Sequence, residues 1–562
     1  MRTNRIGRML AFCFALLIAF SAVQCSVVSA SATGLPEDSW AGGSITATLD
    51  IKEQDAENVT VNAYKLVSVH TAQLEIQSPT DPTEYQPAMP EYTWESGIAD
   101  WVRTNHTAYI GAEDNSVQEV FSTGNEDSNK DISAAVAANF YAEIEAGIMG
   151  GTIHLSPVPL TVSGKTASVS GLTMGVYLVT ATGGTAVYRP TVAMITPEES
   201  NGSWTITENA QVTLKSSPVS LVKTITGVTG SAGAAVSDDH KRAVAGIGDT
   251  VSYKLEVDVP EYPSQAISTE FQITDTLAPG LTLVESTVAA QNGTVSILAD
   301  KITVDMNAGS LTINLDGSTL TPGKGKLVVT YDAQLNASAT LGEAGNVNTA
   351  SLTYSNNPYG AAPATKARAV SDLKTVEDTA TVYTFGIDVA KVAKGTKTGL
   401  QGAKFELKLK DATEKIGFTG SDSTYTKAAE GTATPTTGEG GKLTLKGLAP
   451  GTYKLKETKA PAGYVLSAGE TEITIADTDF DGIPDSKEPP TTDTPTTDTT
   501  TTQTTEKDNG LISITVENTK GFTLPRTGGI GTVLFSMIGI VLMGSGVLLV
   551  AVFLRKRFGK TR

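Results

Sequence analysis

The stretch YKLKETKAPAGY, Tyr453 to Tyr464, contains a charged residue that its own pattern directs into a core. Side chains alternate between the two faces of a β-strand, so the apolar Tyr453 and Leu455 point inward and Glu457 follows them, while the two lysines between them face water. An ionised carboxylate is costly to bury alone. The pattern therefore predicts that Glu457 either is protonated or has a partner in the same core.

Two other strand-like runs of this segment direct a polar side chain inward by the same period. In FGIDVAKV, Lys391 shares a face with Ile387, and in ISITVENT, Asn518 shares a face with Ile514. One interpretation is a buried Lys–Glu pair, with the amide satisfying the remaining hydrogen bonds. The other is chemical: the desolvated, neutral amine of Lys391 attacks the side-chain carbonyl of Asn518, Glu457 transfers the protons, and ammonia leaves.

The preceding part of the chain repeats this arrangement with different residues. The same period places Lys223 of SLVKTI, Asp275 of FQITDTL and Asn348 of NTASLTYS on inward faces. Asn346 lies on the same face as Asn348, so the alternation alone does not decide which of the two amides meets Lys223 and Asp275. A second core is expected to contain a lysine, a carboxylate and an asparagine.

Both segments resemble a known family. GLAPGTYKLKETKAPAGY resembles the E-box of the collagen-adhesin B-type domains of Gram-positive pilins, and SLVKTI, FQITDTLAPGLTL and NTASLTYSNNP resemble the isopeptide-forming second domain of fimbrial subunits. The chain is thus similar to the sortase-assembled major, or backbone, pilins. The resemblance implies two intramolecular isopeptide bonds, each with one catalytic acid: Lys391 to Asn518 with Glu457, and Lys223 to Asn348 with Asp275.

A faint internal repeat extends the comparison to the N-terminal part of the chain. GLTMGVYLVTAT, from Gly171, superposes without gaps on GLAPGTYKLKET, from Gly447, and places Ala181 at the position of Glu457. Because the acid is missing, no bond is expected in this first unit. Lys65 is then an ordinary strand lysine.

The two ends of the chain carry signals for export and anchoring. Residues 1–32 contain three arginines, an apolar run and a small-residue end, which is the pattern of a secretory signal peptide. Residues 524–562 contain LPRTG, an apolar stretch long enough for a transmembrane helix, and a basic tail. This order resembles the LPxTG sorting signal, so we expect a fimbrial protein anchored to the cell wall after transient retention in the membrane.

By this resemblance a sortase recognises Leu524 and Pro525 and cleaves between Thr527 and Gly528. Pilins of this type join the freed threonine to a lysine near the end of the first domain, where this chain has Lys215 in VTLK instead of the usual VYPK. The expected partners are a pilin-type and a housekeeping sortase, other copies of the chain, tip or minor pilins, peptidoglycan and a host surface ligand. If Lys215 is only a linker lysine, the chain is a wall-anchored adhesin that does not polymerise.

The expected fold is mainly β, with tandem immunoglobulin-like (collagen-adhesin A/B-type) β-sandwich domains. The N-terminal pilin domain, residues 33–216, has one added helix with an apolar stripe at Ile132, Val136, Phe140, Ile144 and Ile148. The second domain covers residues 217–373. The third covers residues 380–523 and includes a Thr- and Asp-rich loop at 489–506.

Composition excludes several classes of function. The net charge is −18, and it falls to −26 when the signal and the segment after Thr527 remove eight basic and no acidic residues, which makes nucleic acid an unsuitable partner. Cys13 and Cys25 both lie in the signal, so the mature chain has neither a disulfide nor a thiol nucleophile. Its four histidines show no metal-ligand spacing, and neither an enzyme nor a required cofactor is expected.

DTDFDGIPDSKE, residues 477–488, has oxygen-bearing groups at the spacing of a calcium loop. The preceding TEITIA is strand-like, so this is not a helix-flanked EF-hand, and an acidic solvated loop is the alternative. The expected Ca²⁺ ligands are Asp477, Asp479, Asp481, the carbonyl of Ile483, Asp485 and Glu488.

Overall fold

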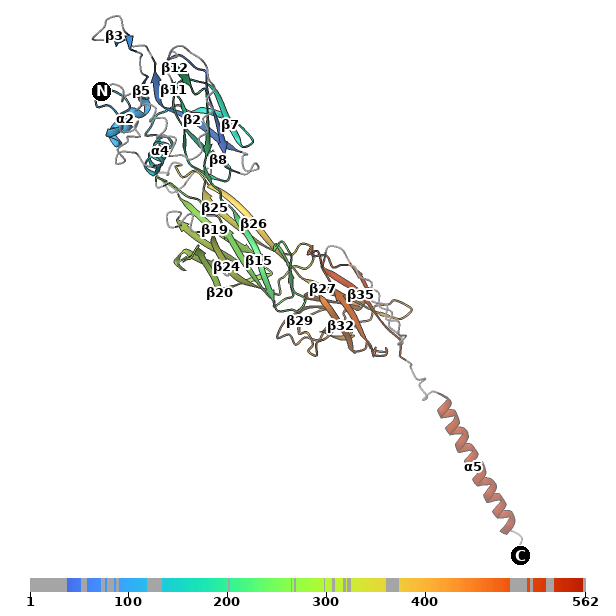
Figure 1. The fold of residues 1–562 in the computed structure, drawn as a ribbon. Coiled ribbons are helices and arrows are strands. Elements are labelled where there is room, and N and C mark those ends of the chain that lie inside the picture. The colour runs from blue at the N-terminus through green and yellow to red at the C-terminus, as the bar shows by residue number, and fades with distance from the viewer. Residues whose placement is uncertain are drawn as a thin grey trace. The chain divides into compact units, whose positions relative to one another are not determined.

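The structure is a computed structural model that describes residues 38–51, 58–71, 76–77, 85–86, 90–118, 134–200, 203–263, 265–266, 269–297, 299–305, 309–316, 320, 325–359, 373–485, 503–505, 509–521 and 530–558. Strands hold about half of these residues and helices a much smaller share, which confirms the mainly β fold (Figure 1). The chain forms two compact units, residues 1–340 with 345–383, and residues 341–344 with 384–562. The predicted signal peptide and the LPRTG motif lie outside the described residues.

The N-terminal part of the first unit is built on one large sheet with the strand order β10-β8-β2-β6-β7-β1-β13, and β5 pairs with β2. Apolar side chains from alternate positions, including Ile45, Val61, Val179 and Leu214, are buried together on one side of it. The strands are β1 (Gly43–Leu49), β2 (Val59–His70), β5 (Glu91–Trp94), β6 (Val158–Ser163), β7 (Thr166–Leu172), β8 (Gly175–Gly183), β10 (Thr191–Ile195) and β13 (Asn209–Leu214).

Helix α4 (Ala134–Met149) is the helix that the apolar stripe predicts. Its Phe140 and Ile144 are buried in a second apolar cluster with residues of β2 and β8, so the helix packs against the sheet (Figure 1). Val136 is 46% exposed and does not belong to this contact, which corrects the predicted stripe. Ile132 lies outside the described residues.

The sequence pattern does not predict α2 (Ser96–Asn105), which packs into the same cluster through Ile98 and Val102. A helix of this length shows only one four-residue apolar repeat, which is too short to be distinguished from chance. The other elements here are η2 (Thr107–Tyr109) and the strand pairs β3 (Ile76–Gln77) with β4 (Tyr85–Gln86), β9 (Val187–Tyr188) with β14 (Ser216–Ser217), and β11 (Pro197–Ser200) with β12 (Ser203–Ile206).

Two further sheets of the first unit form the second sandwich and bury one apolar cluster between them. The five-stranded sheet contains, in order, β15 (Leu221–Thr229), β18 (Thr250–Val257), β24 (Leu327–Leu335), β20 (Leu281–Asn292) and β21 (Val295–Ser296). The seven-stranded sheet contains, in order, β16 (Ala235–Val236), β17 (Arg242–Val244), β26 (Leu373–Tyr383), β25 (Asn346–Ser355), β19 (Glu270–Leu277), β23 (Ser310–Asp316) and β22 (Ile302–Asp305). The short η3 (Ala299–Lys301) precedes β22.

Strand β26 changes the boundary between the second and third domains. The sequence places this boundary at residues 373–380, but β26 continues to Tyr383 and pairs antiparallel with β25 from Leu373 to Val382. Its outward positions are polar and charged, so the stretch has the composition of a linker although its other face completes the second sandwich.

The second unit contains the third sandwich. One sheet has the order β29 (Phe418–Ser421), β30 (Thr424–Lys427), β31 (Lys442–Leu448), β27 (Phe385–Ala393), β35 (Leu511–Asn518) and β34 (Gln503–Thr505). The other contains β28 (Lys404–Leu409), β32 (Gly451–Lys459) and β33 (Glu470–Ile475), and η5 (Glu439–Gly441) precedes β31. Strand β34 lies within the predicted Thr- and Asp-rich loop, so the end of that loop is a strand paired with β35.

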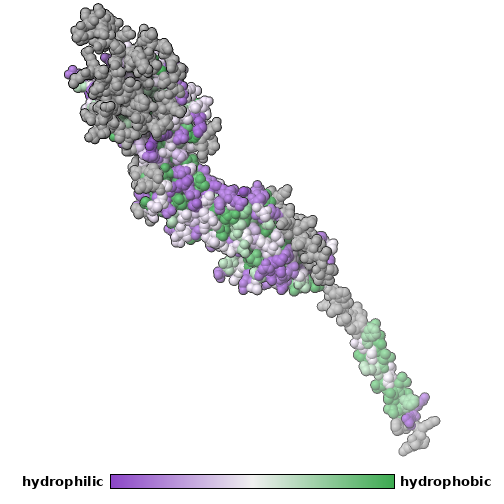
Figure 2. Space-filling model, in the orientation of Figure 1, coloured by the Kyte–Doolittle hydropathy of each residue, from purple (hydrophilic) through white to green (hydrophobic). Residues whose placement is uncertain are grey.

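Helix α5 (Ile530–Phe558) follows the third sandwich in sequence. Within it, Val533–Arg557 is the one helix of the described residues that is long and apolar enough to cross a membrane. Figure 2 shows that the described surface of this helix is hydrophobic except near its basic end.

Candidate isopeptide sites

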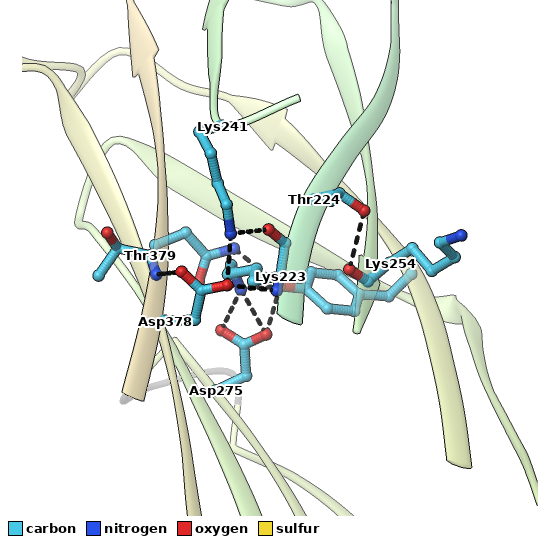
Figure 3. Close-up of polar contacts among 9 residues, drawn as sticks. Lys223, Thr224, Lys241, Lys254, Asp275, Asp378 and Thr379 are labelled. Atoms are coloured by element: carbon cyan, nitrogen blue, oxygen red, sulfur yellow. Dashed lines mark hydrogen bonds and ion pairs between the residues drawn. The ribbon is translucent and has the colours of Figure 1, made fainter. Parts of the chain in front are cut away.

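The second sandwich buries a lysine and an aspartate in contact with each other. Lys223 comes from β15 of the five-stranded sheet and Asp275 from β19 of the other sheet, and neither side chain is exposed. The Lys223 Nζ atom lies 2.7 Å from Asp275 Oδ1 and 2.6 Å from Asp275 Oδ2 (Figure 3). Burial lowers the pKa of Lys223 to about 8, although the neighbouring carboxylate opposes this change. The amine therefore releases a proton more readily than an ordinary lysine does.

Tyr331 of β24 connects the asparagine to this pair. Its hydroxyl donates to Asp275 Oδ2 at 2.5 Å and accepts hydrogen bonds from Lys223 Nζ and Asn348 Nδ2, each at 2.8 Å. Asn348 is fully buried, and its Oδ1 atom has no hydrogen-bond partner. The alternation in KLVVTYDAQL predicts that Tyr331 faces inward, but it does not predict that its hydroxyl meets the charged pair.

Asn346, the other amide that parity allows, is held by the backbone. Its Nδ2 atom donates to the carbonyls of Thr340 and Val382 at 3.0 Å, and its Oδ1 accepts from the Thr340 N–H at 2.9 Å. Its amide donors and its carbonyl acceptor are thus already hydrogen-bonded to the backbone. The structure brings Asn348, and not Asn346, to the Lys–Asp pair.

The backbone of Lys223 is held by two charged side chains (Figure 3). Asp378 Oδ2 accepts from the Lys223 backbone N–H at 2.7 Å, and Lys241 Nζ donates to the Lys223 carbonyl at 2.6 Å. Asp378 and Lys241 also form an ion pair. Because β15 is an edge strand, these side chains satisfy backbone groups that no neighbouring strand reaches.

The third sandwich brings together the three residues that the opening sequence pattern selects. Lys391 of β27 and Asn518 of β35 lie on neighbouring parallel strands, and Glu457 of β32 reaches them from the opposing sheet. Lys391 Nζ donates to Asn518 Oδ1 and lies 3.5 Å from Glu457 Oε1, which also accepts from Asn518 Nδ2 at 3.0 Å. The other Glu457 oxygen accepts from the Ser467 N–H at 3.0 Å. Burial lowers the pKa of Lys391 to about 8, against the opposing effect of Glu457.

The first domain lacks such a cluster at the corresponding strand. Ala181 is buried in β8 and pairs with Val61 of β2. Lys65 of β2 is partly exposed, donates to Thr173 Oγ1 at 2.9 Å and lies 3.8 Å from Glu95 Oε1. The position that would carry an acid therefore carries a methyl group.

Lys215, the expected acceptor of the sortase reaction, lies between β13 and β14 and is exposed. Its carbonyl accepts a hydrogen bond from the Arg189 N–H at 3.0 Å, which fixes the backbone while the side chain remains accessible. The expected cleavage site, Thr527 and Gly528, lies outside the described residues, as do Leu524 and Pro525.

The expected calcium loop is only partly assembled around one point. Carboxylate oxygens of Asp477, Asp479 and Asp481 lie within 4.8 Å of one another, and desolvation raises the pKa of Asp477 to about 6. Asp485 instead accepts from the backbone and hydroxyl of Thr478, so it does not belong to this group. Glu488 lies outside the described residues. The part that Ile483 is expected to play, through its carbonyl, stays a prediction.

Two regions of the chain match known families. Residues 385–485 match SpaA, a prealbumin-like fold domain, and residues 516–557 match the LPXTG cell wall anchor motif. The solved structure of the T6 backbone pilin of serotype M6 Streptococcus pyogenes is similar with a TM-score of 0.55 and 19% identity, over 85% of this chain and 99% of that one. The chain has the fold of a Gram-positive backbone pilin.

The chain also has a curated relative, the trypsin-resistant surface T6 protein of Streptococcus pyogenes serotype M6, to which it is 27% identical over 286 residues. The aligned part is 46% of each protein, so the chain spans about half the length of this relative. The full-length major pilin SpaD of Corynebacterium diphtheriae matches at 18% identity and a TM-score of 0.43, over 86% of this chain and 98% of SpaD. The expected pilin resemblance and the wall-anchored location are confirmed.

Proposed function

We propose that this pilin is the structural backbone subunit of a covalently polymerised surface pilus, and that its second and third domains each form one intramolecular Lys–Asn isopeptide bond. The observation that carries the proposal is the occurrence of two buried clusters of the same chemical composition in different sandwiches. A lone buried ion pair contributes little to stability and is replaceable by apolar residues. The presence of a lysine, an acid and an amide in both cores instead supports a shared reaction.

The proposed reaction needs no external reagent. The acid accepts a proton from the lysine, the neutral amine forms a bond to the side-chain carbonyl carbon of the asparagine, and the asparagine nitrogen leaves as ammonia. Burial of both lysines, which lowers each pKa to about 8, makes the first transfer easier. No cofactor takes part, and each acid acts once on its own chain.

The bonds would suit a chain that is exported without cysteines. In the proposed pilus a sortase joins Thr527 of one copy to Lys215 of the next, after which the assembled fibre is attached to peptidoglycan. Other partners of this surface are tip or minor pilins and a host ligand. An amide, unlike a disulfide, is not broken by reducing agents.

The test of the two bonds is the intact mass of residues 33–523 produced in a host without sortase. We expect the mass to be lower than the sequence mass by two ammonias. Asp275→Ala and Glu457→Ala should each restore one ammonia, and the Lys65→Ala control should change the mass only by its substitution. A mass equal to the sequence mass would reject both bonds.

A further inference from the structure

The two clusters differ in how the asparagine meets the acid. In the third domain Asn518 Nδ2 donates directly to Glu457. In the second domain Asn348 Nδ2 donates to the Tyr331 hydroxyl, and that hydroxyl contacts Asp275. The acid of the second domain thus reaches its amide through a side chain of a third strand.

We propose that Tyr331 is a catalytic residue of the second domain, and that its hydroxyl carries a proton from Asp275 to the leaving nitrogen of Asn348. This inference rests on the proposed isopeptide reaction. The hydroxyl contacts all three partners of that reaction at 2.5 to 2.8 Å. A hydroxyl both donates and accepts, so it transfers a proton between two groups that do not touch each other.

The proton path balances as follows. Asp275 takes a proton from the Lys223 ammonium, and the neutral Nζ forms a bond to Cγ of Asn348. Asp275 passes this proton to the Tyr331 oxygen while the hydroxyl delivers its own proton to Nδ2, and the Cγ–Nδ2 bond breaks to release ammonia. The second proton that Nζ must lose goes to Asp275, which ends the reaction protonated.

Before the reaction the hydroxyl donates to Asp275 and its lone pairs face Lys223 and Asn348. Once Asp275 carries a proton, it becomes a donor and the Tyr331 hydroxyl is free to rotate toward the amide. Burial and the adjacent Asp275 raise the pKa of Tyr331 well above its ordinary value, so the hydroxyl keeps its proton until it is transferred.

The packing around Tyr331 favours a fixed position for this hydroxyl. The side chain is 2% exposed, and its ring stacks on the ring of Tyr253 at a centroid distance of 5.3 Å. Tyr253 is a control for packing, because it is equally buried, and its ring, which lies 5.1 Å from Lys223 Nζ, is kept in Tyr253→Phe. Its hydroxyl lies beside Asn348 but has no hydrogen bond to Lys223 or Asp275 among the contacts of the described residues.

The experiment uses the full chain in its own cells. Newly made protein is labelled in a short pulse and unfolded in hot detergent at successive times, and the crosslinked peptides are counted by mass spectrometry. In Tyr331→Phe we expect the Lys223–Asn348 crosslink to form roughly a hundredfold more slowly than in the wild type, the size of a general acid–base contribution. The Lys391–Asn518 crosslink of the same molecules should form at the wild-type rate, as should both crosslinks of Tyr253→Phe.

Wild-type kinetics in Tyr331→Phe would overturn the proposal, and so would equal slowing in Tyr253→Phe, because packing alone would then explain the effect. A wild-type chain that never forms the Lys223–Asn348 crosslink would instead reject the underlying bond. If Tyr331→Phe loses its protease resistance, fluorotyrosine at position 331 replaces it, since it keeps the ring and the hydroxyl but is more acidic. The proposal expects a several-fold faster crosslink from that substitution, and an unchanged rate would refute it.

Discussion

Glu457 and Asp275 have the same proposed task but different contacts. Glu457 contacts both its lysine and its amide, and a backbone N–H holds its other oxygen. Asp275 uses both oxygens on Lys223 and shares one of them with a tyrosine. Glu457 can pass a proton directly to its amide nitrogen, whereas Asp275 needs the tyrosine hydroxyl between them. Both arrangements bring a proton to an amide nitrogen in a buried core.

The pH dependence of bond formation follows from the two lysines. The reactive state, a neutral amine beside a neutral acid, contains as many protons as the ion pair, so its population is constant while that proton is retained. Above the lysine pKa, about 8 in both clusters, the proton is lost to solvent and no acid remains to protonate the leaving nitrogen. We expect a flat rate from this pH down to the range in which the cluster takes up a second proton, and a decline of about tenfold per pH unit above it.

This profile is measurable with residues 33–523 collected unfolded before either bond has formed, diluted from denaturant into buffers on both sides of the lysine pKa, with each crosslinked peptide counted over time. A rate that continues to rise in alkaline buffer would show that a neutral amine alone is sufficient. The acid would then have no part in the slow step.

At the scale of single elements, strand β15 depends on side chains from outside its own sheet. Asp378 and Lys241 bind the N–H and the carbonyl of Lys223 on the edge that lacks a neighbouring strand. The placement of Lys223 Nζ beside Asp275 depends on this edge staying closed. Asp378 and Lys241 thus satisfy the backbone hydrogen bonds of one residue, as an additional strand would do for the whole edge.

Asp378→Ala is expected to loosen this edge locally. A hydrogen bond to a charged group contributes about 2 kcal/mol, so the free energy of local opening at the Lys223 amide should fall by about that amount in native-state hydrogen exchange. Glu377→Ala is the matched control, because its carboxylate contacts only the exposed Ser351 hydroxyl among the contacts found, and it should change the value by less than about 0.5 kcal/mol. Equal protection in the two variants would contradict the role of Asp378.

The loop after β33 stays a predicted calcium site. Three carboxylates converge there, and burial, with smaller contributions from Asp479 and Asp481, raises the pKa of Asp477 to about 6. We expect stoichiometric binding of Ca²⁺ in calorimetry that is lost in Asp477→Ala and kept in Asp411→Ala, a change at an exposed acid of the same domain. Absence of heat in the wild type would leave an acidic solvated loop.

Strand parity explains how far the sequence alone could predict these sites. It places Lys223, Asp275 and Glu457 in their cores because side-chain direction in a strand depends only on odd or even position. It cannot separate Asn346 from Asn348, which share parity. Tyr331 and Asp378 are missed because their roles depend on which strands face each other across a sandwich, and that depends on topology rather than on local sequence.

At the scale of the whole molecule, the proposed bonds connect different parts of their domains. The bond in the third domain would join β27 to β35, the neighbouring first and last long strands of that sandwich. The bond in the second domain would join its two sheets. Each closes a loop of more than 100 residues, which by analogy with disulfides contributes about 4 kcal/mol through the unfolded state. More importantly, each keeps its domain from extending fully under load.

Such internal bonds matter most if the subunits are also covalently joined, because a fibre is no stronger than its weakest connection. We therefore expect boiled, enzymatically released cell-wall material to give a high-mass ladder of this protein on a denaturing gel. Lys215 is exposed while its backbone is fixed by Arg189, so it is available to a sortase-bound neighbour. Lys215→Ala should collapse the ladder to a monomer.

Lys165→Ala is the control for this experiment, since Lys165 is an exposed turn lysine of the same domain and should leave the ladder intact. A ladder that persists in Lys215→Ala would move the acceptor to another lysine while keeping the polymer. A monomer band in the wild type would exclude polymerisation, and the chain would then be a wall-anchored adhesin whose internal bonds resist load in isolated molecules. The three outcomes separate the position of the acceptor from the existence of the fibre, because only the last one removes the need for any acceptor lysine on the chain itself.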